Sequence, residues 1–195
     1  MYRKFSRSCP KGGTCLADVI ISEFAIGEGE ITRGSILKEI PSLKLTERQA
    51  SYRLAHLVKN GTLIKMGSGR NTRYRINKNG KSVTYLMHLN KEPFELIKSG
   101  QKTVEMRLND RKRKYIEVGD NIIFGNDDGE TILVKVSDRA VYESFDELYA
   151  AYEDKTVLGY REGETASPSD MLEYYTKERI AENGALALTV TLINK

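Results

Sequence analysis

The most constraining stretch of this sequence is residues 100–107, GQKTVEMR, in which polar and apolar side chains alternate from Thr103 onward. If residues 103–108 form a β-strand, alternate side chains share one face of it. Thr103, Glu105 and Arg107 then point one way, and the apolar side chains between them point the other way. Because the apolar face has a core to pack against, we expect the polar face, with Lys102 at its start, to line a cleft.

The charge of the chain is divided unevenly along its length. Residues 1–81 contain 16 Lys and Arg against 6 Asp and Glu, whereas residues 82–195 contain 15 against 21. The first part therefore carries a net charge of +10 and the second −6, which together give the overall +4. Such a split is typical of two units with different partners. A basic excess on a small domain is typical of nucleic-acid binding.

Length and composition narrow the class of protein further. A chain of 195 residues can hold one large domain or two small ones. It has no apolar run long enough to span a bilayer and no signal-peptide pattern, so we expect a cytoplasmic protein with no membrane partner. Cys9 and Cys15, with only two histidines in the chain, make no recognisable metal site. We therefore expect free thiols, no metal and no cofactor.

Residues 14–79 are predicted to form three helices and a β-hairpin, after a flexible basic arm at residues 1–13. Helical spacing of apolar residues and strand patterns place these elements at 16–24, 32–40, 46–59, 62–66 and 72–76. Thr46 and Gln49 make a capping box at the start of the third helix. The loop between the two strands is rich in glycine, which suits a hairpin.

This order of elements resembles the winged helix-turn-helix family, through the third helix TERQASYRLAHLVKNG and the hairpin TLIKMGSGRNTRYRI. The resemblance implies that the third helix enters the major groove and that the hairpin, or wing, lies against the backbone or minor groove. Arginine and glutamine can pair with base edges, and arginines on a glycine-rich loop can approach phosphates. The implied nucleic-acid contacts are Arg48, Gln49, Tyr52, Arg53, Arg70, Asn71 and Arg73. A protein-docking module and a merely solvated face are the alternatives.

Residues 80–195 are predicted to form a second domain in which strands outnumber helices. Strand patterns occur at 83–89, 103–108, 131–142 and 185–193, and residues 116–124 have the pattern of a strand, a turn and a strand. Helical patterns occur at 92–99, 145–152 and 170–182. Residues 154–168 are expected to be a loop. A small β-barrel with inserted helices is the economical architecture, so the predicted fold class is α+β.

The second domain resembles the ASCH family, a branch of the PUA-like β-barrel superfold. The resemblance rests on the pattern GxKxxExR, present as Gly100, Lys102, Glu105 and Arg107, and on residues further along the chain. Those further residues are Gly119-Asp120, Tyr174-Tyr175 and Gly184. The resemblance implies a barrel with a cleft that binds RNA or a nucleotide. The implied cleft residues are Lys102, Thr103, Glu105, Arg107 and Tyr175.

Some ASCH proteins resemble small hydrolases, which makes Lys102 and Glu105 candidate catalytic residues. Amidohydrolases that deacylate modified cytidine pair the motif lysine with a threonine nucleophile on the same strand. Here Glu105 occupies the threonine position, and Thr103 lies two residues earlier. A carboxylate cannot replace an alkoxide nucleophile activated by a nearby base. For RNA cleavage, Lys102 and Arg107 would hold a phosphate while Glu105 deprotonates a 2′-hydroxyl.

The sequence therefore predicts a nucleic-acid-binding regulator of transcription with two domains. A winged helix at residues 14–79 binds DNA, and an ASCH barrel at residues 80–195 binds RNA or a nucleotide. Two alternatives stay open. One is an RNA-processing enzyme, a ribonuclease or an amidohydrolase, that uses the ASCH cleft. The other is a docking inhibitor or adaptor with a protein partner.

Overall fold

The computed structural model of the protein describes residues 15–193. Its contacts divide the chain into two compact units, Met1–Asn79 and Gly80–Lys195, each of which is described by itself. Within the described residues, no helix has both the length and the apolar character needed to cross a membrane.

The prediction of free thiols is wrong for Cys15, which is disulfide-bonded. The chain's other cysteine, Cys9, lies outside the described residues.

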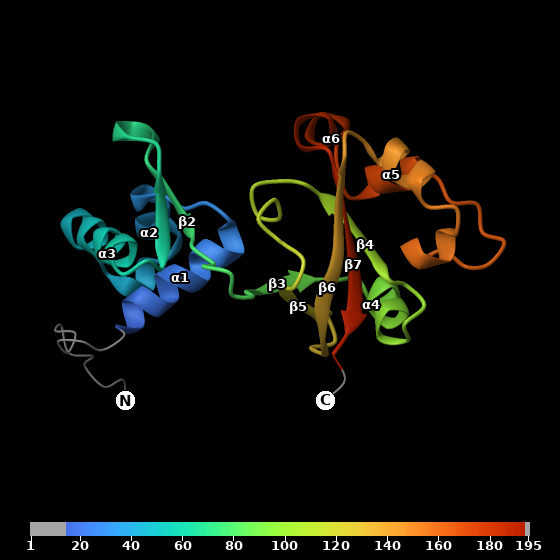
Figure 1. Ribbon diagram of the computed structural model, residues 1–195, viewed down its shortest axis with the longest axis horizontal. Helices are drawn as coiled ribbons and strands as arrows, with labels where there is room; N and C mark the ends of the chain where they lie inside the picture. The colour runs from blue at the N-terminus through green and yellow to red at the C-terminus, as the bar shows by residue number, and fades with distance from the viewer. Residues whose placement is uncertain (1–14, 194–195) are drawn as a thin grey trace. The chain divides into compact units, whose positions relative to one another are not determined.

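The N-terminal unit contains three helices and a two-stranded hairpin (Figure 1). Its elements are α1 Leu16–Glu28, α2 Arg33–Glu39, η1 Pro41–Leu43, α3 Glu47–Lys59, β1 Leu63–Met66, η2 Gly69–Asn71 and β2 Arg73–Ile76. Strands β1 and β2 are antiparallel, and a bridge between Ile31 and Tyr74 attaches the segment before α2 to the hairpin. The buried core is made by Ile21, Ala25, Ile31, Ile36, Leu54, Leu57 and Leu63. The predicted order of elements is therefore confirmed.

Side-chain caps fix the starts of α2 and α3. At α3, the backbone N–H of Gln49 donates to Thr46 Oγ1, and the backbone N–H of Thr46 donates to Gln49 Oε1. The predicted capping box is therefore present. Thr32 and Ser35 make the same reciprocal pair at the start of α2. Both caps satisfy backbone N–H groups that have no partner within the helix.

The C-terminal unit is built on a five-stranded sheet with helices packed on it. Its elements are β3 Thr84–His88, α4 Lys91–Lys98, β4 Val104–Leu108, β5 Asn121–Gly125, β6 Thr131–Tyr142, α5 Phe145–Ala151, η3 Lys155–Leu158, η4 Pro168–Glu173, α6 Lys177–Asn183 and β7 Ala185–Leu192. The strand order is β3-β5-β6-β7-β4, in which β3 and β5 are parallel and the other neighbours are antiparallel.

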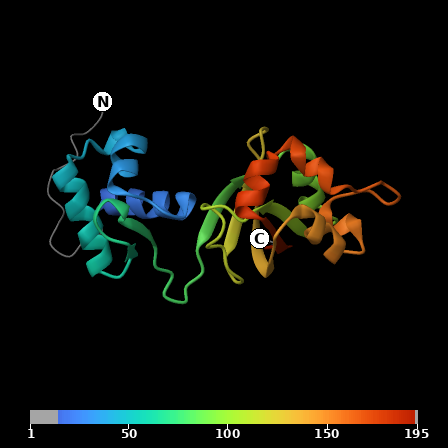
Figure 2. The same ribbon diagram turned by 90° about the horizontal axis from the view of Figure 1, so that it is seen from above.

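The sheet curls into a half-barrel, which is consistent with the predicted PUA-like barrel (Figures 1 and 2). Strands β3 and β4 lie at its two edges, so no backbone ladder joins them. Two predictions are corrected. The strand predicted before the turn within residues 116–124 is absent, because residues 116–120 contain no strand. The predicted helix at 170–182 is split into η4 and α6, because Thr176 caps a new helix.

The apolar face of β4 packs into the main core of this unit. Val104, Met106 and Leu108 belong to a buried cluster with side chains from α5, η4 and β7. The predicted alternation along β4 is confirmed, because Glu105 and Arg107 point to the opposite face. The strand is therefore fixed in register by its apolar side.

Gly184, between α6 and β7, generates a prediction about stability. Its backbone has φ 69° and ψ −173°, and a Cβ there would lie 2.5 Å from the carbonyl oxygen of Tyr142. We expect Gly184→Ala to lower the free energy of unfolding of this unit by about 3 kcal/mol, because a strained backbone is combined with a clash. Calorimetry of the full chain measures this.

Gly100→Ala is the matched control. Gly100 also has a positive φ, 82°, but a Cβ there would meet no atom within 4 Å. The Gly100→Ala change should lower the free energy of unfolding by only about 1 kcal/mol, the cost of placing alanine in a left-handed backbone conformation. Equal losses in the two variants would contradict the clash.

Candidate functional site

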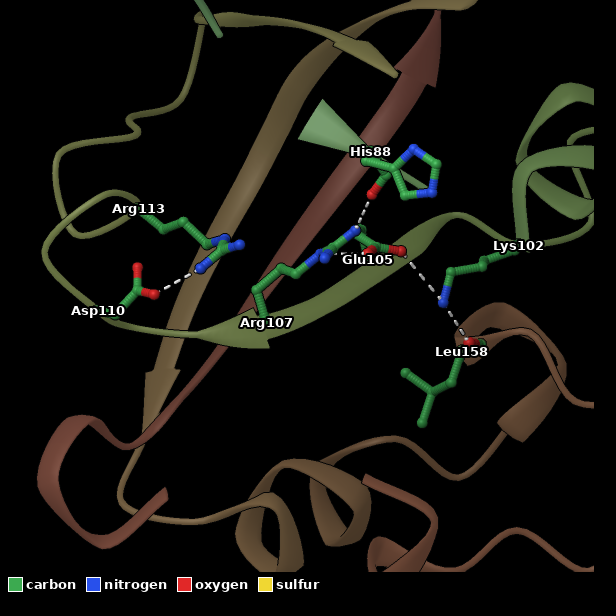
Figure 3. Close-up of polar contacts among 7 residues, drawn as sticks. All are labelled: His88, Lys102, Glu105, Arg107, Asp110, Arg113 and Leu158. Atoms are coloured by element: carbon green, nitrogen blue, oxygen red, sulfur yellow. Dashed lines mark hydrogen bonds and ion pairs between the residues drawn. The ribbon is translucent and has the colours of Figure 1, made fainter. Parts of the chain in front are cut away.

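Three charged side chains of the GxKxxExR pattern form an ion triad beside the polar face of β4: Glu105 and Arg107 from the strand and Lys102 from just before it (Figure 3). The Glu105 carboxylate lies between two cations: Oε1 accepts a hydrogen bond from Arg107 Nε at 2.7 Å, and Oε2 lies 3.4 Å from Lys102 Nζ. The side chains of Lys102 and Glu105 are only 6% and 5% exposed, whereas that of Arg107 is 17% exposed. The triad therefore carries a net positive charge that is largely shielded from water.

Lys102 is fixed by a segment far away in sequence. Its Nζ donates a hydrogen bond of 2.6 Å to the carbonyl oxygen of Leu158, at the end of η3. Gly159 follows with φ 110°, and a Cβ there would lie 3.1 Å from Lys102 Cδ. Only glycine therefore allows this close approach without displacing the lysine. Residues 154–168 were predicted only to be a loop, and no local sequence pattern indicated this contact with Lys102.

Arg107 connects the two edges of the half-barrel. Its Nη2 donates a hydrogen bond of 2.7 Å to the carbonyl oxygen of His88, at the end of β3 (Figure 3). Burial lowers the pKa of Arg107, but the Glu105 carboxylate and a hydrogen bond with Tyr175 outweigh it, so that its pKa is raised. The guanidinium therefore stays charged and bridges β4 to β3, which share no backbone ladder.

The remaining predicted cleft residues have packing or backbone roles. The Thr103 backbone N–H donates to the Val157 carbonyl oxygen at 3.0 Å, which ties the start of β4 to η3. Tyr175 is buried, and its ring stacks on Phe145 with 5.9 Å between the centroids. The structure thus brings Lys102, Glu105, Arg107 and Tyr175 together as a network of mutual contacts.

The predicted nucleic-acid contacts on α3 differ in their availability. Arg48 is exposed, and Tyr52 is 65% exposed. Gln49 is also exposed, but its side-chain oxygen already caps the helix. Arg53 is half-buried at 18% exposure and lies 3.6 Å from the buried carboxylate of Asp18 in α1. The structure therefore gives Arg53 a role in holding α3 to α1.

The wing residues are exposed at the tip of the hairpin. Arg70 and Asn71 lie in η2, and Arg73 begins β2, where its guanidinium lies 3.6 Å from the Glu30 carboxylate. The turn itself requires glycine at Gly67, whose φ is 67°, because a Cβ there would lie 2.7 Å from the Asn71 carbonyl oxygen. The hairpin therefore holds Arg70 and Asn71 on a tight turn.

Among residues 15–193, no group of three or more His, Cys, Asp or Glu side chains is placed to hold a metal ion.

Comparison with known proteins identifies the second unit. The family model of the ASCH domain matches residues 87–194. The crystal structure of hypothetical protein PH0355 is 35% identical, over 56% of this chain and 99% of that chain, with a TM-score of 0.49. The solution NMR structure of protein PF0455 from Pyrococcus furiosus is 27% identical, over 57% of this chain and 99% of that chain, with a TM-score of 0.45. No curated protein matches the chain.

The triad generates a prediction about stability. We expect Glu105→Gln to lower the free energy of unfolding by about 3 kcal/mol, because two buried cations lose their shared counter-charge. Thermal unfolding followed by circular dichroism measures the loss. Glu92→Gln is the control: its ion pair with Arg161 has both side chains more than two-thirds exposed, so the unfolding temperature should barely change. An unchanged unfolding temperature in Glu105→Gln would show that the triad is not a stabilising unit.

Proposed function

Because the chain belongs to the ASCH family, a family associated with RNA binding, we propose that it is a two-part nucleic-acid-binding protein. Its ASCH unit binds RNA or a nucleotide. Its N-terminal unit is a winged helix that binds duplex DNA, which fits a regulator of transcription. The observation that carries the DNA-binding part is the set of exposed cations on α3 and the hairpin.

The charge of the N-terminal unit supports duplex binding. Residues 15–79 contain 11 Lys and Arg against 6 Asp and Glu. Arg53 and Arg73 have carboxylate partners within this unit, whereas Arg48 and Arg70 are exposed on α3 and on the wing turn. A helix presented beside a hairpin suits entry into a groove. Arg48 and Tyr52 then contact the duplex, and Gln49 fixes the start of the helix.

The ASCH unit supports RNA binding through the segment that follows β4. The unit is acidic overall, yet Arg111, Lys112 and Lys114 lie exposed in the loop directly after the motif strand. Arg107 is the most exposed member of the triad, so it is the member that a phosphate can reach. In this proposal, the triad positions Arg107, and the loop supplies the surrounding positive charge.

The geometry favours binding over catalysis in the ASCH unit. A catalytic Lys102 or Glu105 would have to reach a substrate, yet both side chains are buried and lie against each other. Each also has a second partner, Leu158 for the lysine and Arg107 for the glutamate. The residues that were candidates for catalysis are therefore better suited to supporting Arg107.

Duplex binding is tested by its salt dependence. We expect Arg48→Ala and Arg70→Ala each to weaken binding to a duplex and to reduce the slope of log K against log salt by about 0.9, the value for one phosphate contact. Fluorescence anisotropy with a labelled duplex at several salt concentrations measures both quantities. Lys98→Ala removes the same charge from the ASCH unit and should leave the slope unchanged. If the wild-type chain binds no duplex even at low salt, the DNA part of the proposal fails.

RNA binding is tested separately on the ASCH unit. We expect the double variant Arg111→Ala/Lys112→Ala to bind a single-stranded RNA oligonucleotide about tenfold more weakly, because two phosphate contacts are lost. The control Lys91→Ala/Lys98→Ala removes the same charge from α4, where both lysines pair with carboxylates. Equal loss in both double variants would indicate a non-specific effect of charge. Loss of RNA with time, rather than binding, would support the enzyme alternative.

A further inference from the structure

The N-terminal unit contains a pocket of about 440 Å³ that the motifs in the sequence did not indicate. It lies where α2, α3 and the hairpin meet, and a volume of this size is typical of small-molecule sites. Its lining residues fall into two main groups: the cations Arg33, Lys65 and Arg70, and the hydroxyl-bearing Thr32, Ser51, Thr72 and Tyr74. Two glycines and Leu54 complete it.

The charge of this pocket is entirely positive. Its three cations come from three different elements, α2, β1 and η2, and no Asp or Glu belongs to the lining. Three cations held near one another repel, and this repulsion is relieved when an anion binds among them. The pocket therefore favours an anionic ligand over a neutral or cationic one.

The cations are available for such a ligand. Within residues 15–193, neither Lys65 nor Arg70 forms an ion pair. Arg33 lies 3.4 Å from Glu47, but the two side chains are 53% and 73% exposed. Such an exposed ion pair contributes little free energy, so a bound anion can replace Glu47 as the partner of Arg33. Arg33 also donates a long hydrogen bond of 3.5 Å to Ser51 Oγ, which places the guanidinium against the pocket wall.

The arrangement of donors suits phosphate better than carboxylate. A carboxylate offers two oxygens in one plane, whereas a phosphate group offers several oxygens in different directions. The donors belong to three different elements, α2, β1 and η2, and can each reach a separate oxygen. Arginine also binds phosphate through two parallel N–H groups.

We propose that this pocket binds a phosphate group, with Arg33, Lys65 and Arg70 as its cationic ligands. Two sources share this chemistry: a nucleotide free in solution and the backbone of a nucleic acid. For the backbone, the inference rests on the proposed duplex binding. For the free nucleotide, the inference is independent of that proposal, and the N-terminal unit would then bind a regulatory small-molecule ligand.

The test follows the backbone amide resonances of pocket residues by NMR on the full chain, with AMP, adenosine and a duplex as separate probes. We expect AMP or the duplex to shift the amides of Gly34, Ser51 and Gly69 in a saturable way, and adenosine, which has no phosphate, to leave them unchanged. Lys65→Gln/Arg70→Gln should weaken this binding about tenfold or more, because charge-assisted hydrogen bonds are lost. Lys38→Gln/Lys44→Gln removes the same charge outside the pocket lining and should have little effect.

The outcomes separate the two sources and the two proposals. Shifts with AMP identify a free nucleotide, and shifts with the duplex alone identify a backbone phosphate. If the duplex binds while the pocket amides stay unchanged with both probes, the pocket inference is overturned and the duplex proposal stands. If AMP binds in the pocket and no duplex binds at all, the inference stands and the duplex proposal fails. Equal binding by the pocket variant and the wild type would also overturn the inference.

Discussion

The C-terminal unit depends on one carboxylate held between two cations. Glu105 lies against Lys102, just before β4, and against Arg107, which shares with Glu105 the face of β4 opposite the apolar core. Removing charged groups from water is costly, and it is tolerated here because each charge has a partner. The triad also ties separate parts of the unit to β4, since Lys102 holds η3 through Leu158 and Arg107 holds β3 through His88.

This arrangement changes what the motif of the ASCH family means in this chain. The sheet is open between β3 and β4, and the Arg107 guanidinium spans that opening with a side-chain hydrogen bond. Lysine and glutamate of the motif therefore act first as the support of the arginine. A pattern with an ammonium, a carboxylate and a guanidinium within six residues resembles a catalytic site in sequence, but in the structure these groups contact one another and the backbone carbonyls of Leu158 and His88.

The features that depend on neighbouring residues along the chain could be predicted from the sequence. The capping box of Thr46 and Gln49 and the alternation along β4 follow from spacing alone, and both are present. The partners of Lys102 and Arg53 are Leu158 and Asp18, which lie 56 and 35 positions away, so no local pattern could reveal them. For the same reason the sequence showed Arg53 as a free cation on a helix face, although its partner lies on another helix.

The cations of the N-terminal unit differ in whether they pair with a carboxylate of the same unit. Arg53 and Arg73 have carboxylate partners inside the unit, which fixes their side chains and reduces their attraction for a phosphate. Arg48, Lys65 and Arg70 are exposed and add charge to α3, β1 and the wing turn. Because an exposed charge on a folded unit gains little from neighbouring protein, its favourable partner is an anion from solution. The proposed binding of duplex and phosphate therefore relies on these three exposed cations rather than on Arg53 and Arg73.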